Sequence, residues 1–287
     1  MTSPAVADAV RAAVCVAARL GVTGTDPAVL HDGANVIVHL SPAPAVAKVA
    51  VTTPLVRPDI AVWLQRELDL AMYLAAAGIP VMEPSPEVPA TAHSGEGHVM
   101  SFWRYLETQE AQRPDEDTIG AMLHDLHSVL RSYPGAAPEL APLRDIPAYL
   151  AREDKQISAQ DAAALGAAYE RLTAELDLAW CRDTAQVLHG DAGAGNLTAV
   201  PGGWVWHDFE DTCTGPVAFD LAASTASQYL DGARILAAYG DPVDAAQLAI
   251  CQQLRRLHLT VWYALYAERL PWCRPRSAEL LALWRTA

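Results

Sequence analysis

Positive charge is scarce in this sequence of 287 residues. It has 20 lysines and arginines against 34 aspartates and glutamates, which gives a formal net charge of -14. Nucleic acids and anionic membranes are therefore poor default partners, because neither is attracted to an acidic surface. The charge would suit a cationic small molecule, and acidity for solubility alone is the competing explanation.

Cysteine motifs, membrane-length apolar runs and a basic leader are also missing. The five cysteines are scattered and show no CxxC spacing, so the sequence predicts neither a zinc site nor a disulfide framework. No apolar run is long enough to span a membrane, and MTSPAVADAV lacks the pattern of a signal peptide. We therefore expect a cytoplasmic protein. Its hydrophobic content of 52% favours a folded chain of one large domain or two lobes.

The most informative stretch is VLHGDAGAGNLTAVPGGWVWHDFEDTCTGPVAFDL, residues 187–221. Inside it, a short apolar run at 197–200 and a second run at 204–206 flank the turn residues Pro201, Gly202 and Gly203. Two such runs around proline and glycine are typical of a β-hairpin. We expect the hairpin to bring the residues before it close to those after it.

Three polar residues flank this hairpin: Asp191, Asn196 and Asp208. Phosphoryl transfer needs such a set, because one carboxylate accepts the proton of the attacking hydroxyl while an amide oxygen and a second carboxylate hold Mg²⁺ on the nucleotide phosphates. The spacing HGDxxxxN matches the Asp-to-Asn interval of the protein-kinase motif HRDxxxxN, and Asp208-Phe209-Glu210 stands where kinases have Asp-Phe-Gly. The alternative is an acidic turn beside a surface hairpin.

Glycine in the middle of His-Gly-Asp, glutamate after Asp208-Phe209, and the trailing Gly-Pro-x-x-x-Asp-Leu give this stretch a family character. It resembles the aminoglycoside phosphotransferase family and its choline-kinase-like relatives, with a specific core motif and a weaker N-terminal part. The resemblance implies an α+β, bilobal protein-kinase-like fold. Its parts would be a small antiparallel-sheet lobe at 1–100, a hinge at 101–104, and a helical lobe at 105–287 that carries the catalytic loop and the hairpin.

The resemblance also assigns roles. Asp191 would be the catalytic base, and Asn196 and Asp208 the Mg²⁺ ligands. His189 would support the loop by hydrogen bonding. Asp220 would accept backbone N–H groups of the catalytic loop, and a helix N-cap is the alternative.

The acidic neighbours Glu210 and Asp211 are candidate substrate contacts. They could receive a substrate amine or be solvated neighbours of the metal site. Many relatives have His-Pro between the catalytic Asp and the metal Asn, where this chain has Gly193-Ala194. That difference concerns the identity of the substrate more than phosphoryl transfer itself.

Lys48 lies in the β-like run AVAKVAV at 45–51, and only one other lysine, Lys155, occurs in the chain. An isolated lysine in a strand often points to solvent from a sheet edge. The kinase-like alternative is that it spans the nucleotide phosphates and pairs with a helical acid. Glu67 borders the apolar stripe of a helix expected at 59–77 and is the candidate partner, and a solvated surface glutamate is the competing interpretation.

Two further segments are candidates for nucleotide binding. The turn HDGAN at 31–35 could pass over the phosphates, with Gly33 allowing close approach and Asn35 beside it, although an ordinary hairpin turn fits as well. In the family, the strand that leaves the small lobe becomes a hinge whose backbone contacts adenine. An aromatic strand that serves as core is compatible with that role. The residues in question are Met100, Ser101, Phe102 and Trp103.

Periodicity and capping signals predict the remaining elements. Helices are expected at 5–20, 118–130, 158–177 and from 217 onward, with breaks near 240 and 271, and strands near 29–30, 36–38 and 98–105. His124 and His127 have no third ligand at a sensible spacing, so we interpret them as packing or surface residues rather than metal ligands.

The sequence thus predicts an ATP-dependent O-phosphotransferase acting on a small hydroxyl compound, with GTP not excluded and Mg²⁺ as the metal. Aminoglycosides, aminocyclitols, amino alcohols and sugars remain open as acceptors, as do the oligomeric state and a role in resistance, biosynthesis or metabolism. A nucleotide-binding protein with little catalysis is the alternative. Protein phosphorylation is disfavoured, because the interval between Asp208 and Gly215 is too short for a peptide-docking activation segment.

Overall fold

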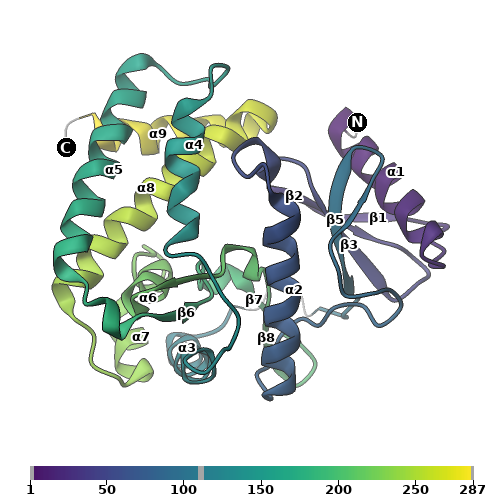
Figure 1. Ribbon diagram of the computed structural model, residues 1–287, viewed down its shortest axis with the longest axis horizontal. Helices are drawn as coiled ribbons and strands as arrows, with labels where there is room; N and C mark the ends of the chain where they lie inside the picture. The colour runs from purple at the N-terminus through teal and green to yellow at the C-terminus, as the bar shows by residue number, and fades with distance from the viewer. Residues whose placement is uncertain (1–2, 109–112, 286–287) are drawn as a thin grey trace. The chain divides into compact units, whose positions relative to one another are not determined.

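The computed structural model describes residues 3–108 and 113–285 (Figure 1). Two compact units are present: Met1–Arg113 with Leu197–Glu210, and Pro114–Asn196 with Asp211–Ala287. The predicted second lobe covers all of 105–287, whereas the hairpin belongs to the first unit. The hinge at 101–104 stays a prediction, and the predicted lobe limits include residues outside the described ranges.

The first unit contains a five-stranded antiparallel sheet, as expected for the fold class. It also holds helices α1 (Pro4–Arg19) and α2 (Ile60–Ala76) and the hairpin of β7 (Leu197–Val200) and β8 (Gly203–Trp206). Along the sheet the strands are β1 (Ala28–Asp32), β2 (Asn35–His39), β3 (Ala45–Ala50), β5 (His98–Arg104) and β4 (His93–Gly95).

Strand β3 lies in the middle of this sheet and is buried on both faces. Successive side chains of a strand point to opposite faces. Ala47 and Val49 accordingly belong to the core that includes α1, whereas Val46 packs in a separate cluster with Leu68 of α2. Lys48 shares the parity of Val46, and it therefore points toward α2. Figure 1 shows α1 and α2 on opposite sides of the sheet.

The hairpin is bonded to the rest of the first unit through Trp206, whose side chain is fully buried. The N–H of Trp206 donates to the carbonyl of Pro80 at 2.9 Å, and the N–H of Met82 donates to the carbonyl of Trp206 at 2.8 Å. These bonds fix the end of β8, and Asp208 follows it by two residues.

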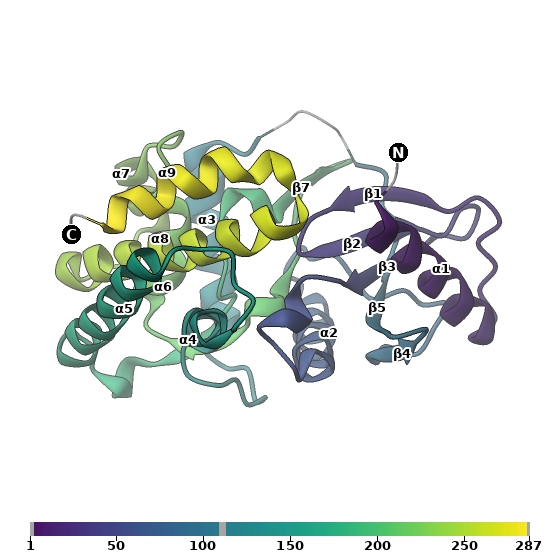
Figure 2. The same cartoon turned by 90° about the horizontal axis from the view of Figure 1, so that it is seen from above.

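The second unit is mainly helical. Its helices are α3 (Glu116–Leu130), α4 (Asp145–Ala151), α5 (Ala159–Ala179), α6 (Val217–Thr225), α7 (Gly232–Tyr239), α8 (Ala245–Arg269) and α9 (Arg274–Trp284). Helix α8 packs against α4, α5, α6 and α9, and Figure 2 shows α9 alongside it. Strands β6 (Gln186–Leu188) and β9 (Cys213–Gly215) form a short antiparallel pair that the sequence analysis missed.

None of the described helices combines the length and the apolarity that crossing a membrane requires.

Candidate active site

The side chain of Lys48 lies at the centre of a buried charge cluster in the first unit. Lys48 is 5% exposed, and its Nζ lies 2.9 Å from both carboxylate oxygens of Glu67. The same Nζ is 2.5 Å from Oδ1 of Asp208 and 3.0 Å from Oε2 of Glu210. Lys48 is therefore a buried lysine of a central strand, not a solvated lysine of an edge strand.

Burial and charge act in opposite directions on this cluster. Burial alone would lower the pKa of Lys48, but the carboxylates of Asp208, Glu67 and Glu210 outweigh it and hold that pKa well above its usual value. Burial, followed by repulsion from Asp208 and Glu210, raises the pKa of Glu67 to about 8 against the opposing effect of Lys48. The ammonium group stays charged at neutral pH, as a contact to phosphate would require.

Asp208 has an unusual backbone conformation. Its φ is 64°, in the left-handed region that few residues other than glycine adopt, and aspartate is among those that tolerate it. Its side chain is 44% exposed although its partner Lys48 is buried. Strained backbone geometry of this kind is concentrated at functional sites.

Glu210 is an internal ion-pair partner in the structure, neither solvated nor open to a ligand. It is 4% exposed. Its Oε1 accepts from Arg57 Nη1 at 2.8 Å and its Oε2 from Asn35 Nδ2 at 2.7 Å. This does not match the sequence-based idea that it receives a substrate amine, because the arginine, the amide and Lys48 already engage both oxygens. Arg57 was missed by the sequence analysis, since it belongs to no motif.

Asn35 and Gly33 occupy the β1–β2 turn region. Asn35 is 7% exposed, and besides contacting Glu210 it accepts from Thr53 Oγ1 at 3.1 Å. A Cβ at Gly33 would lie 2.5 Å from Nε2 of His31, so the histidine ring fills the space where a side chain would be. A phosphate contact by this turn stays a prediction.

The predicted hinge residues Met100, Ser101, Phe102 and Trp103 lie within β5 and are buried. They pair with Val49 through Val46 of β3 on one side. On the other side the carbonyl of Phe102 accepts from the N–H of Ser85 at 3.0 Å, and His93 of β4 pairs with Met100. Sheet pairing therefore engages this backbone, as the core interpretation requires.

In the second unit, the loop after β6 is held by Asp220, which is fully buried near the start of α6. Its two oxygens accept from the N–H groups of His189 and Gly190, each at 2.8 Å. Nε2 of His127 lies 3.1 Å from the Asp220 carboxylate, and Nδ1 lies 3.0 Å from the hydroxyl of Tyr239. His127 is thus buried, and its contact with Asp220, 93 residues away, is one that no sequence motif indicates.

Burial alone would raise the pKa of Asp220, yet that pKa is held below its usual value. The hydrogen bond and charge of His127, the charge of His189 and the N–H of Gly190 outweigh burial. The carboxylate is thus ionised at neutral pH and can anchor two successive backbone donors.

Gly190 has no room for a side chain. Its φ is 88°, and a Cβ at this position would overlap the backbone carbonyl of Asp211. The glycine of His-Gly-Asp is therefore required by the close approach of two loops. Asp211 itself is half-buried.

Asp191 is oriented by two side chains. Asn196 Nδ2 donates to Oδ2 of Asp191 at 3.1 Å and to its carbonyl at 2.6 Å. Arg255 of α8 donates to Oδ1 of Asp191 and, at 2.8 Å, to the carbonyl of Gly190. The Asp191 side chain remains 41% exposed. Arg255 was missed by the sequence analysis, because nothing in the pattern of α8 marks it.

The predicted metal ligands fit Mg²⁺ in chemical kind. Asn196 and Asp208 offer amide and carboxylate oxygens, the hard donors that Mg²⁺ prefers. In the part of the chain that the structure describes, no group of three or more His, Cys, Asp and Glu side chains forms a metal cage. Two protein oxygens completed by substrate phosphates are the usual arrangement for Mg²⁺ in phosphoryl-transfer sites.

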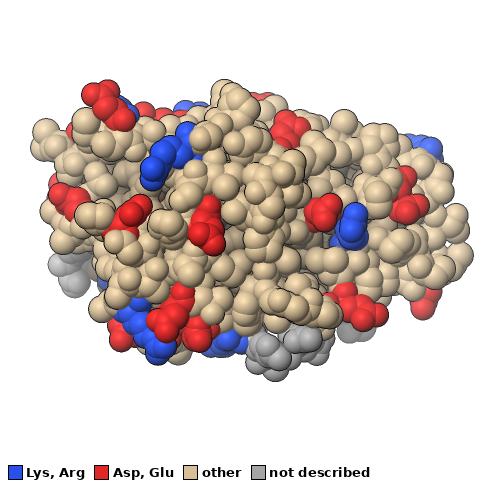
Figure 3. Space-filling view, turned by 90° about the horizontal axis from the view of Figure 1, so that it is seen from below, with Lys and Arg blue, Asp and Glu red and all other residues tan. Residues whose placement is uncertain are grey.

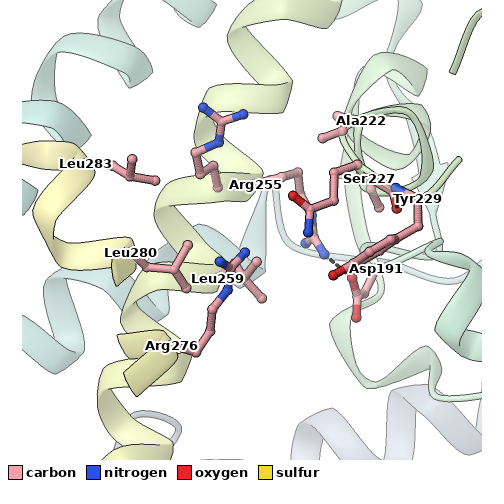
Figure 4. Close-up of a pocket in the computed structure, with 13 residues that line it drawn as sticks. Asp191, Ala222, Ser227, Tyr229, Arg255, Leu259, Arg276, Leu280 and Leu283 are labelled. Atoms are coloured by element: carbon pink, nitrogen blue, oxygen red, sulfur yellow. Dashed lines mark hydrogen bonds and ion pairs between the residues drawn. The ribbon is translucent and has the colours of Figure 1, made fainter. Parts of the chain in front are cut away.

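A pocket of about 580 Å³ adjoins Asp191 within the second unit. Figure 4 shows Asp191 and Arg255 joined at one side, with Leu259, Leu280 and Leu283 of α8 and α9 at the other. A space of this size accommodates a small organic molecule.

Comparison with known proteins places this geometry in context. The chain has no significant match among curated proteins. An amicoumacin kinase solved with AMP-PNP, Ca²⁺ and Ami is 15% identical, with a TM-score of 0.66 over 91% of this chain and 88% of that chain. A type VIII aminoglycoside-3'-phosphotransferase is 20% identical, with a TM-score of 0.61 over 89% of this chain and 100% of that chain. The choline kinase LicA from Streptococcus pneumoniae is 16% identical, with a TM-score of 0.60 over 94% of this chain and 97% of that chain.

These likenesses confirm the kinase-like fold predicted from the sequence. The model of the phosphotransferase enzyme family matches residues 35–250, a range that contains the Lys48 cluster, the Asp191 loop and most of the residues around them. This chain therefore belongs to the phosphotransferase enzyme family.

Proposed function

We propose that this protein is an ATP-dependent O-phosphotransferase that phosphorylates a hydroxyl group of a small molecule. The observation that carries the proposal is the setting of Asp191. Its half-exposed carboxylate is fixed by Asn196 and Arg255 beside a pocket of small-molecule size. A positioned carboxylate next to a binding space is what activation of a hydroxyl requires.

In the proposed reaction, the acceptor oxygen forms a bond to the γ-phosphorus of ATP. The bond from that phosphorus to the β–γ bridging oxygen breaks, and ADP leaves. The proton of the acceptor hydroxyl passes to the carboxylate of Asp191. Asn196 and Arg255 keep that carboxylate in one orientation, so that little reorganisation is needed when the proton moves.

The residues of the first unit would receive the nucleotide. Lys48, held by Glu67, supplies a fixed cation for the phosphates. Asn196 and Asp208 would hold Mg²⁺, which when bound neutralises charge on the phosphate oxygens. The backbone that contacts the nucleobase would lie at the end of β5 and in the residues immediately after it. Up to Arg104 the strand is hydrogen-bonded to β3 on one side, and Phe102 and Arg104 are bonded to Ser85 and Glu83 on the other.

A small-molecule partner also agrees with the surface. Figure 3 shows acidic and basic side chains interspersed on the drawn face, and on the described part of that face they form no continuous basic stripe. This distribution and the net charge of -14 support the proposal that the partner is a small molecule and not a nucleic acid or an anionic membrane. Similar kinases are named for amicoumacin, aminoglycosides and choline, so compounds of these classes belong among the acceptors to be tested.

The test is ADP release from Mg·ATP, and separately from Mg·GTP, with a panel of hydroxyl acceptors. Asp191→Asn should reduce turnover by about 10²–10⁴-fold while nucleotide binding persists, because only the proton acceptor is lost. Asp208→Asn should instead weaken metal-dependent nucleotide binding. Near-normal turnover in Asp191→Asn would refute the assignment of the base.

Asp183→Asn is the matched control, since Asp183 is an exposed aspartate of the same unit. It should leave turnover unchanged. If Mg·ATP binds but no acceptor stimulates ADP release, the alternative of a nucleotide-binding protein with little catalysis gains support.

A further inference from the structure

The pocket beside Asp191 has an unexpected charge. Three arginines line it, Arg255, Arg256 and Arg276, against Asp191 as the single carboxylate. The chain as a whole carries a net charge of -14. A basic pocket in an acidic protein is a local feature that average composition does not explain.

The three arginines are committed to different degrees. Arg255 is used by Asp191 and the Gly190 carbonyl. Arg276 Nη1 lies 2.9 Å from Oε2 of Glu279, but both side chains are about half exposed, at 46% and 65%, and such surface pairs are weak. Arg256 is exposed and its guanidinium has no ion pair among the residues that the structure describes. The pocket therefore offers one uncommitted cation and a second that is easily recruited.

The pocket also has an apolar side. Leu259 and Leu283 are 44% and 52% exposed, and both line it together with Leu280 (Figure 4). An apolar ligand group that covers these leucines would bind favourably, because it would remove apolar surface from water. A matching ligand would combine an anionic group with an apolar body.

We propose that the acceptor is a hydroxyl compound that bears a carboxylate or phosphate group beside an apolar body, and not a polycation. The proposal rests on the phosphotransferase function, and it concerns only which substrate class the Asp191 pocket takes. Arg256 and Arg276 would bind the anionic group, because guanidinium groups form paired hydrogen bonds with such oxygens. A polycationic aminoglycoside would bring like charges against both arginines.

Three compounds of similar size test the charge preference: 4-(hydroxymethyl)benzoate, 4-(hydroxymethyl)benzylamine and 1,4-benzenedimethanol. Each has a benzylic hydroxyl on an aromatic ring. The group at the opposite end of the ring is anionic, cationic or neutral, respectively. Binding to the whole protein would be measured calorimetrically with Mg·AMP-PNP present, and ADP release would be measured with Mg·ATP. We expect the benzoate to bind at least about tenfold more tightly than the amine, the effect of one charge-assisted contact.

Charge reversal tests the site with a result that loss of structure alone cannot produce. Arg256→Glu should invert the order, so that the amine binds more tightly than the benzoate. Arg276→Gln should weaken benzoate binding and leave binding of the diol unchanged. The control is Arg274→Gln, an exposed arginine two residues before Arg276 on α9 that is not among the pocket residues, and it should preserve the order.

Any of three results would overturn the proposed acceptor class. These are tighter binding of the benzylamine or of kanamycin than of the benzoate, equal binding of the three compounds, and no binding of the benzoate. The two proposals fail separately. Asp191-dependent phosphorylation of the hydroxyl group of an amine-bearing acceptor, without phosphorylation of the benzoate, would support the phosphotransferase and refute the anionic acceptor. Suppose that the benzoate binds more tightly than the amine and that Arg256→Glu inverts this order, but no acceptor stimulates ADP release. That result would support the anionic site and count against the phosphotransferase.

Discussion

Among single residues, Gly190 has the tightest surroundings. An alanine there would need a left-handed backbone and would overlap the carbonyl of Asp211, so we expect Gly190→Ala to cost about 2–4 kcal/mol and to displace Asp191. Urea unfolding and turnover are the measurements. Gly240→Ala is the control, because Gly240 has a similar φ of 84° in the same unit with open space around it. Equal destabilisation by the two substitutions would contradict the overlap.

Glu67 gives the first unit a distinctive pH dependence. Its pKa is raised from 4.5 to about 8 in the folded protein, so between these values the native state holds a proton that the unfolded chain has released. The free energy of unfolding contributed by this group is therefore full below pH 4.5 and is lost as pH rises through about 8.

Glu67→Gln cannot release this proton, so wild type should lose stability relative to the variant as pH rises through this window. Urea unfolding of both proteins across the window measures the difference. Glu175→Gln, at a half-exposed glutamate of α5, is the control and should run parallel to wild type. Parallel curves for Glu67→Gln would show that the pKa is not raised.

Among the elements, α8 links the catalytic loop to the pocket, since it carries Arg255, Arg256 and Leu259. Its N-cap is Asp244, whose side chain accepts from the N–H of Gln247 at 2.8 Å. Removing this N-cap by Asp244→Ala should lower stability by about 1 kcal/mol. The acceptor KM should not change, because Arg255 lies three turns beyond the cap and helix ends fray only locally.

Thermal or urea unfolding measures the capping effect, with Asp244→Ser as the conservative variant that keeps a capping oxygen. A large change in KM with Asp244→Ala would mean that the start of α8 is coupled to the pocket.

At the scale of the whole molecule, the first unit is discontinuous in sequence. Residues 197–210 supply the buried Trp206 as well as Asp208 and Glu210, two of the three carboxylates around Lys48. We therefore expect a fragment of residues 1–113 to lack a cooperative unfolding transition. Joining residues 197–210 to it through a flexible linker should restore one.

Circular dichroism with urea is the measurement. A fusion that carries Asp208→Asn and Glu210→Gln should be less stable than the unmodified fusion, because Lys48 would lose two of its three carboxylate partners and Arg57 would lose its ion pair with Glu210. A cooperative transition in the fragment 1–113 alone would show that the hairpin is dispensable for folding.

Features that depend on residues close together in the chain could be predicted from the sequence. Apolar periodicity and caps located the long helices, for example α1, whose Ser3 accepts from the N–H of Val6 at 3.3 Å. Turn residues located the β7–β8 hairpin, and the motif HGDxxxxN with its following Asp indicated the family that the comparison confirmed. Each of these signals comes from residues that are close together in the sequence.

The contacts between distant side chains, in contrast, could be seen only in the folded chain. Asn35 and Glu210 are 175 residues apart, Arg57 and Glu210 are 153 apart, and Arg255 and Asp191 are 64 apart. No local sequence signal indicated the basic lining of the pocket either. The physical reason is that an ion pair or a pocket wall forms wherever packing brings charges and apolar groups together, and local propensity carries no information about partners that arrive from remote parts of the chain.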